Sequence, residues 1–302
     1  MLVPLLHFTP VDRPFLLSWA VDPTILTGLV LAAAIYGLAW RRIQLTGRRT
    51  VPLGYPLAYY LGLFSIAFAL LGPFDVYNQE SLLMHMSQHL LLLQIAPPLI
   101  WLGRPVQLIL QAVSPQRSGP VLRVALRRQS VRALLTFVSH PLVAFLAFNF
   151  AVIFWHVPKM YDLALSHQTV HELEHICFLV GGLLYWWAIV EPVPRHHKLR
   201  TGFALGSIFL SMLVAEALGA ILTLDGSVIY PFYNQTRPLW GLSQLEDQQY
   251  AGLLMWVGGG LLYLGILFGL LIRSFGRDDY QPSAGTVSNV TATTPATAEA
   301  PS

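Results

Sequence analysis

Seven apolar runs, each long enough to cross a lipid bilayer, dominate this chain. They cover residues 23–40, 55–72, 82–102, 139–156, 168–190, 201–223 and 250–272. A helix needs about 17–25 residues to cross roughly 30 Å of hydrocarbon. Only 11% of the 302 residues are charged, whereas soluble domains average about 25%. The sequence therefore predicts an all-α, polytopic membrane protein with seven transmembrane helices.

The basic residues indicate how these helices are oriented. Of the 18 Lys and Arg residues, 15 follow the first, third, fifth and seventh runs. Cytoplasmic loops carry an excess of Lys and Arg. We therefore predict an N-terminus outside the cytoplasm and a C-terminus inside it, which agrees with an odd number of spans.

One helical domain with two short ends is expected. Residues 1–22 are interrupted by three prolines and lack the basic start of a signal peptide, which predicts a short extracytoplasmic segment. The seven-helix domain covers 23–277. Residues 278–302 are rich in Ala, Thr, Pro and Ser, a composition typical of a disordered tail. Inside the domain, Pro97 and Pro98 are expected to kink or break the inner end of the third run.

Two histidine pairs interrupt the apolar runs. His85 and His89 lie in the third run, and His171 and His175 lie in the fifth. A spacing of four residues puts both imidazoles of a pair on one helix face. The predicted orientation puts both pairs in the outer half of the membrane, where polar groups are costly and usually functional. Because imidazole is the commonest metal ligand, we predict one shared metal or cofactor site.

Further side chains fall at the same predicted level. Met86 and His156 are second-choice ligands, although Met86 could simply pack and His156 could bond its own backbone. Glu216 lies deep in the sixth run, where a carboxylate needs a cation, a metal or a proton. Asp247 lies at the mouth of the seventh run. Both carboxylates are candidates for orienting imidazoles or balancing charge.

The ligand types leave the metal open. Histidine with a thioether suits copper, above all Cu(I), whereas histidine with a carboxylate suits zinc equally well. A site built from cysteines alone is excluded because Cys177 is the single cysteine. Two histidines on different helices could also be the axial ligands of a b-type haem. A copper transporter is a further alternative, but polar residues are few in the predicted cytoplasmic half.

A local motif favours a different chemistry. Residues His171 to His175 spell H-E-x-x-H, in which zinc proteases use both histidines as ligands and the adjacent glutamate, here Glu172, as general base. Asp225 with the following glycine is similar to the Asp-Gly motif of intramembrane metalloproteases. Asp225, however, falls in a predicted outer loop, and a hydrolase would leave the other histidine pair without a task. We therefore treat zinc-dependent hydrolysis as a lesser alternative.

Three blocks of the sequence carry a family resemblance. The first contains Met84 to Leu92, Ala96-Pro97-Pro98-Leu99 and Leu102-Gly103-Arg104-Pro105. The second contains Phe154-Trp155-His156-Val157-Pro158, Tyr161-Asp162, His171, Leu173-Glu174-His175, Phe178-Leu179 and Trp186-Trp187. The third contains Asp247-Gln248-Gln249, Ala251-Gly252 and Met255-Trp256-Val257. In this order they resemble the CtaG-type cytochrome c oxidase assembly factors, over roughly half of the chain.

The resemblance implies a bacterial plasma membrane protein that supplies copper to a haem–copper oxidase and does not turn over a substrate. It implies that Glu172 is incidental, whereas Glu174 fits the family pattern and joins the charge-balancing candidates. The expected cargo is copper, as Cu(I) more than Cu(II), with zinc less expected and haem least. The expected partners are a cytochrome c oxidase subunit, an extracytoplasmic copper donor and the lipid bilayer, without nucleic acid.

Overall fold

The computed structural model describes residues 14–46, 50–113, 129–138, 140–190, 201–236 and 238–278. Every regular element within these ranges is helical, as the sequence predicted. The longer elements are α1 (Pro23–Leu45), α2 (Gly54–Leu70), α4 (Leu82–Leu90), α5 (Ala96–Leu102), α6 (Pro105–Ala112), α8 (Gln129–Val138), α9 (Pro141–His156), α10 (Pro158–Ser166), α11 (Gln168–Val190), α12 (Thr201–Leu224), α13 (Gln244–Leu253) and α14 (Gly260–Asp278). The shorter ones are η2 (Phe15–Leu17), α3 (Pro73–Tyr77), η3 (Leu91–Ile95), η4 (Pro231–Gln235), η5 (Leu239–Gly241) and η6 (Leu254–Gly259).

Five helical segments of the described chain are long and apolar enough to cross a membrane. They are Pro23–Leu45, Gly54–Tyr77, Gln168–Val190, Gly202–Leu224 and Gln244–Ile272. The pair α9 and α10, bent by 78°, makes a sixth if it counts as one span. The predicted run 82–102 is helical throughout but is not in this set. Its polar residues reduce its apolar character, so a total of seven spans stays a prediction.

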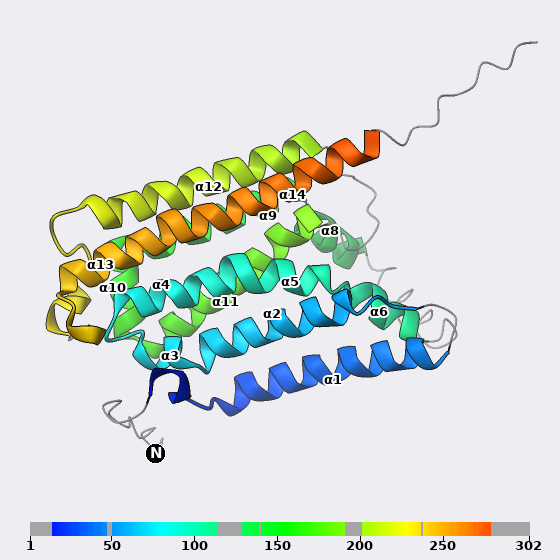
Figure 1. The fold of residues 1–302 in the computed structure, drawn as a ribbon, viewed down its shortest axis with the longest axis horizontal. Helices are drawn as coiled ribbons and strands as arrows, with labels where there is room; N and C mark the ends of the chain where they lie inside the picture. Colours follow the sequence, from blue (N-terminus) through cyan, green and yellow to red (C-terminus); the bar gives the residue numbers. More distant parts are fainter. Residues whose placement is uncertain are drawn as a thin grey trace, which may run out of the picture.

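The elements between the long helices alternate between the two ends of the bundle. In Figure 1, α3, α10 and α13 lie at one end, whereas α6, α8 and the C-terminal end of α14 lie at the other. This arrangement agrees with the predicted alternation of loops, and the inside–outside assignment still rests on the charge bias alone. Most of the predicted N-terminal segment (1–13) and nearly all of the predicted tail (279–302) fall outside the described residues.

A sharp bend follows the fourth predicted run. Pro158 lacks an N–H group and disfavours helical geometry at the residue before it. Val157 accordingly has φ −64° and ψ 126°, and α9 ends at His156. Proline suits the first turn of a helix, so α10 begins at once. Residues 157–167 lie between the predicted runs 139–156 and 168–190, but as a helix this segment inserts Tyr161, which is fully buried, into the bundle.

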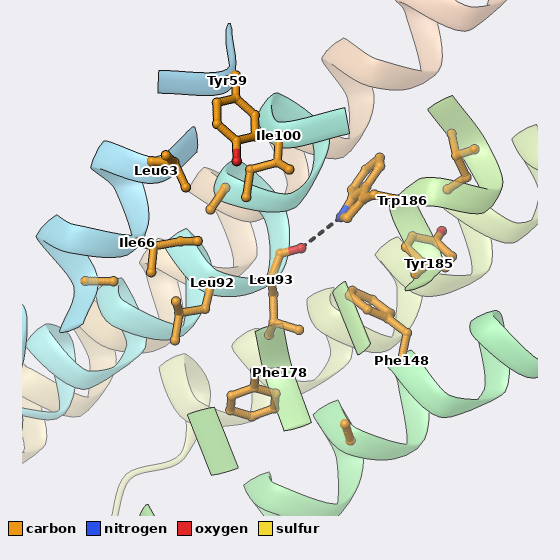
Figure 2. Packing of buried hydrophobic residues seen from close by; sticks show 14 of the residues in the cluster. Tyr59, Leu63, Ile66, Leu92, Leu93, Ile100, Phe148, Phe178, Tyr185 and Trp186 are labelled. Atoms are coloured by element: carbon orange, nitrogen blue, oxygen red, sulfur yellow. Dashed lines mark hydrogen bonds between the residues drawn. The ribbon is translucent and has the colours of Figure 1, made fainter. Parts of the chain in front are cut away.

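The prolines of the third run produce a kink of a specific kind. The chain passes through the π-helical segment η3 and continues as α5, so the run stays helical. Pro97 cannot donate to the carbonyl oxygen of Leu93, four residues earlier. That oxygen instead accepts a hydrogen bond of 2.8 Å from the indole N–H of Trp186 on α11, drawn as a dashed line in Figure 2. Pro97 thus leaves the Leu93 carbonyl oxygen free to accept the hydrogen bond that joins the two histidine-bearing segments.

A glycine lets α11 approach this kink closely. A Cβ atom at Gly182 would lie 3.2 Å from the carbonyl oxygens of Leu92 and Leu93 and 2.9 Å from Cγ of Pro97. Such contacts are tighter than side chains normally tolerate in a packed interior. Close packing here fixes the separation of α4 and α11 one to two turns further along, where the histidines lie.

Part of the hydrophobic core adjoins the four histidines. Phe148, Phe178, Trp186 and Leu92 are buried and pack together between α9, α11 and η3 (Figure 2). The ring centroid of Phe178 lies 4.5 Å from that of His89. This apolar floor separates the candidate site from the opposite end of the bundle.

Candidate metal centre

The two histidine pairs face each other across α4 and α11. Within each pair, the ring centroids lie 4.2 Å apart (His85 and His89) and 4.1 Å apart (His171 and His175). Between the helices, the distances are 5.0 Å from His85 to His171 and 5.8 Å from His89 to His175. All four side chains are buried. The structure therefore brings together the four residues predicted as ligands.

Glu174 completes the cluster. Its side chain is fully buried, with Oε2 3.7 Å from Nε2 of His85 and Oε1 3.6 Å from Nε2 of His89. Residues three apart share a helix face, so Glu174 points the same way as His171. Glu172, by contrast, is exposed and accepts a hydrogen bond of 3.2 Å from Gln168 on its own helix. The glutamate of the H-E-x-x-H motif therefore lies outside the cluster.

Several polar atoms of the cluster lack hydrogen-bond partners. Among the described residues, none bonds either ring nitrogen of His89, Nε2 of His175 or either carboxylate oxygen of Glu174. Buried polar atoms are nearly always paired, and unpaired ones call for an ion, a water or a functional reason. Donor atoms of His85, His89 and His175, and of His85, His171 and Glu174, lie within 4.8 Å of one another. These two overlapping groups have the chemistry and spacing of a metal site.

A chain of hydroxyl groups contacts Nδ1 of His85. Tyr233 donates to the carbonyl oxygen of Asn78 at 2.7 Å, so its oxygen can only accept from the Tyr161 hydroxyl and from Nδ1 of His85, each 3.3 Å away. Tyr161 lies 2.7 Å from Nδ1 of His85 and has one proton, which it can donate to Tyr233 or to that nitrogen. When Tyr161 donates to Tyr233, Nδ1 of His85 is the donor and its Nε2 lone pair is free for a metal. Metal-binding histidines are commonly oriented in this way through their second nitrogen.

The loop after α12 covers the cluster. Tyr233 comes from η4, and its neighbour Tyr230 donates to the carbonyl oxygen of His156 at 3.1 Å. Burial raises the pKa of Tyr233, which keeps its hydroxyl proton available for donation. The sequence predicted no role for either residue, because a loop tyrosine carries no spacing signal. Tyr161 occurred in the second sequence block, but nothing in the sequence tied it to His85.

Residues 34–276 match the cytochrome c oxidase caa3 assembly factor family, Caa3_CtaG. The chain belongs to this family. The match contains all five residues of the cluster and the tyrosines that cover it, and it confirms the resemblance expected from the sequence. The description of the family names cytochrome c oxidase assembly.

Two mycobacterial proteins illustrate the relatives of this chain. The chain is 25% identical to the uncharacterized protein ML1998 of Mycobacterium leprae over 270 residues, which is 88% of this chain and 41% of that protein. It is 28% identical to the uncharacterized protein Mb0105 of Mycobacterium bovis over 250 residues, which is 82% of this chain and 38% of that protein. The chain thus spans about two fifths of the length of these relatives. No solved structure matches it.

Asp247 positions a helix and does not contact an imidazole. Its carboxylate accepts from the Ser81 hydroxyl and from the Leu82 N–H group, both at 2.6 Å. Ser81 is itself the N-cap of α4 and accepts from the N–H group of Met84. A carboxylate at a helix N-terminus satisfies free N–H groups and complements the helix dipole. Asp247 thus ties α13 to the start of the helix that carries His85.

Two further candidates from the sequence lie apart from the cluster. Glu216 is half-buried, and its Oε1 packs against Gly260 of α14 instead of contacting an imidazole. Asp225 accepts from the N–H and hydroxyl groups of Ser227 within its own turn, so the Asp-Gly motif supplies no ligand to the cluster. The sequence could not give the direction of these two side chains. His167, a further histidine near the start of α11, is exposed.

His156 and Met86 border the cluster on its inner side. The ring centroid of His156 lies 6.1 Å from that of His89, and Nδ1 of His156 donates to the carbonyl oxygen of Val152 at 2.6 Å. The backbone hydrogen bond considered for His156 is therefore present, and it uses only one of the two ring nitrogens. Met86 is buried, 1% exposed, on the same helix as His89.

Proposed function

We propose that this assembly factor binds a copper ion between α4 and α11 and supplies it to a cytochrome c oxidase subunit. One observation carries the proposal: buried imidazole and carboxylate atoms converge without hydrogen-bond partners at His89, His175 and Glu174. A bound cation would satisfy these atoms together. First-choice ligands are His85, His89, His171 and His175, with Glu174 as charge partner or further ligand.

The charge of the cluster favours a monovalent ion. Four neutral imidazoles and one carboxylate carry a charge of −1, which Cu(I) neutralises and which Zn²⁺ or Cu²⁺ exceeds by one. An uncompensated charge in a dry interior is costly. Copper is also the cargo that the resemblance to the CtaG-type assembly factors leads us to expect. The donor set and the charge balance together support Cu(I) as the cargo.

Delivery follows from ligand exchange on the outer side. The bias of Lys and Arg supports an extracytoplasmic location of the cluster in a seven-span protein of the bacterial plasma membrane. Copper would arrive from an extracytoplasmic donor, bind beneath the loop that carries Tyr233 and pass to the oxidase subunit. Multiple imidazoles allow one ligand to be replaced at a time while the others hold the ion.

The geometry supports copper supply over the alternatives. A zinc hydrolase would need Glu172 next to the metal, and that residue is exposed. A haem needs a pocket of several hundred Å³, whereas the four histidine rings lie within 4.1–6.1 Å of their neighbours in the cluster. The apolar floor around Phe178 argues against a transport path that continues from the histidines toward the cytoplasm.

Metal analysis of the purified full-length protein tests the proposal. Loaded anaerobically with Cu(I) and washed with a weak chelator, the wild type should retain copper, and the double variant His85→Ala/His89→Ala should lose it. His167→Ala, which removes an exposed histidine at the same end of the bundle, should retain it. In cells, the double variant should also leave cytochrome c oxidase deficient in copper. Retention of zinc in place of copper by the wild type, or unchanged copper in the double variant, would contradict the assignment.

A further inference from the structure

A small cavity adjoins the inner side of the histidine cluster. It has a volume of about 30 Å³, which is enough to hold a water molecule. Residues from α4, η3, α9, α12, η6 and α14 line it, including Met86, His89, His156 and Met255. The cavity is therefore large enough for a metal ion, and it contains imidazoles and thioethers but no carboxylate among its lining residues.

Both imidazoles at the cavity have a nitrogen available for a ligand. His156 donates through Nδ1 to the Val152 carbonyl oxygen, so its Nε2 carries a lone pair. That Nε2 atom has no hydrogen-bond partner among the described residues, and the side chain is 6% exposed. His89 is 3% exposed and lacks partners at both nitrogens. A buried imidazole that is oriented on one side and unpaired on the other is prepared to bind a cation.

Two thioethers complete the donor set. Met86 comes from α4 and is 1% exposed, whereas Met255 comes from η6 and is 8% exposed. Both line the cavity and belong to the same buried cluster. Thioether sulfur is a soft ligand that selects Cu(I) over zinc. The cavity therefore offers softer donors than the outer cluster does.

Two π-helical segments contribute to this cavity. Gln94 belongs to η3 and Met255 to η6, and both residues line it. Short π segments inside α-helices occur frequently at functional sites. Two of them at one cavity are an independent indication that the local geometry serves a ligand and not helix stability alone.

We propose a second Cu(I) position, formed by Met86, His89, His156 and Met255, on the inner side of the cluster. The inference extends the proposed function, because His89 belongs to both positions. The outer position contains the carboxylate of Glu174, whereas the inner one has only neutral donors. A copper ion can move between them by exchanging its other ligands while His89 stays bound, with no change in oxidation state. The inner position holds the ion away from the outer surface, and the outer position presents it for transfer.

X-ray absorption at the copper edge of the full-length protein, purified in detergent and loaded with Cu(I), tests the inner position. The wild type should show a sulfur shell in addition to nitrogen. The double variant Met86→Leu/Met255→Leu should keep copper but lose the sulfur shell, since methionine and leucine have similar volumes. Met84→Leu, an equally buried methionine on the same helix that does not line the cavity, should leave the spectrum unchanged.

A second variant separates the inner position from the proposed function. The double variant His171→Ala/His175→Ala removes outer ligands only, so it should still bind copper with a sulfur-rich shell. A wild-type spectrum with nitrogen alone, or a sulfur shell that survives Met86→Leu/Met255→Leu, would overturn the inner position and leave the outer site standing. A wild-type protein that binds no copper at all would overturn both.

Discussion

The hydroxyl oxygen of Tyr161 lies 2.7 Å from Nδ1 of His85, and this contact occupies one of the two ring nitrogens of the histidine. The Tyr161 hydroxyl also lies 3.3 Å from that of Tyr233, which donates to the carbonyl oxygen of Asn78. The other ring nitrogen of His85, Nε2, faces His171, 3.3 Å away. Nε2 is therefore the nitrogen of His85 that is placed to bind a metal.

Replacement of Tyr161 by Phe should weaken metal binding while the fold is kept. The variant removes the hydroxyl group that contacts Nδ1 of His85 and orients its ring. Loss of a hydrogen-bond partner of a metal-binding histidine typically lowers metal affinity about 10- to 100-fold. Tyr233→Phe should have a smaller effect in the same direction, because it acts through Tyr161. Competition with a chromophoric Cu(I) chelator measures both. Tyr250→Phe, at a half-exposed position on α13, is the matched control and should bind like the wild type. Equal affinity for all three variants would show that the hydroxyl chain does not orient the site.

The two glutamates of the H-E-x-x-H segment should behave oppositely. Glu174→Gln removes the one negative charge of the cluster, so Cu(I) affinity should fall by at least about tenfold, or roughly 1.4 kcal/mol. Glu172→Gln alters an exposed side chain and should change neither copper affinity nor oxidase assembly. Chelator competition and the copper content of the oxidase measure the two effects. A Glu172→Gln protein that binds metal normally but fails in function would support the hydrolase alternative.

Asp247→Asn should destabilise the protein. The carboxylate accepts two buried hydrogen bonds at the start of α4, and the loss of its charge should cost about 1–3 kcal/mol. We expect a lower melting temperature of the purified protein, measured by thermal unfolding in detergent. Asp225→Asn, in which the affected carboxylate serves only a local turn with Ser227, is the control and should melt like the wild type. Unchanged melting of Asp247→Asn would show that the cap contributes little.

Gly182→Ala should separate α11 from η3. The new methyl group would meet the carbonyl oxygens of Leu92 and Leu93 at 3.2 Å, and overpacking of this kind costs about 1–3 kcal/mol. The adjacent variant Gly181→Ala places its methyl group 3.7 Å from Cα of Phe148, an ordinary contact, and should be neutral. Thermal unfolding compares the two. Because the shift also moves one histidine pair away from the other, Gly182→Ala should bind copper more weakly. Equal behaviour of both variants would contradict the close approach.

Local rules in the sequence were enough to place most helices. Length and apolar character located the runs that became α1, α11 and α12, because a helix satisfies its own backbone hydrogen bonds and needs no distant partner. Spacing of four residues correctly put His85 with His89 on one face. Proline chemistry predicted a kink after position 96, but not that the helix would continue through a π-helical segment. The helix α10 was missed, because its nine residues, which begin with a proline, resemble a loop in composition.

The sequence by itself determined that this is a helical, membrane-type chain with two histidine pairs at one level, since periodicity and polarity are properties of the chain. Only the tertiary structure decided which side chains meet. In the structure, Glu174 lies in the cluster, whereas Glu216 lies against Gly260. Depth alone could not distinguish them, because a rotation about the helix axis changes the partner of a residue without changing its depth. The tertiary structure also brought Tyr161 and Tyr233 to His85, from segments separated by 72 residues. Contacts of this kind depend on how helices pack, and no local pattern encodes them.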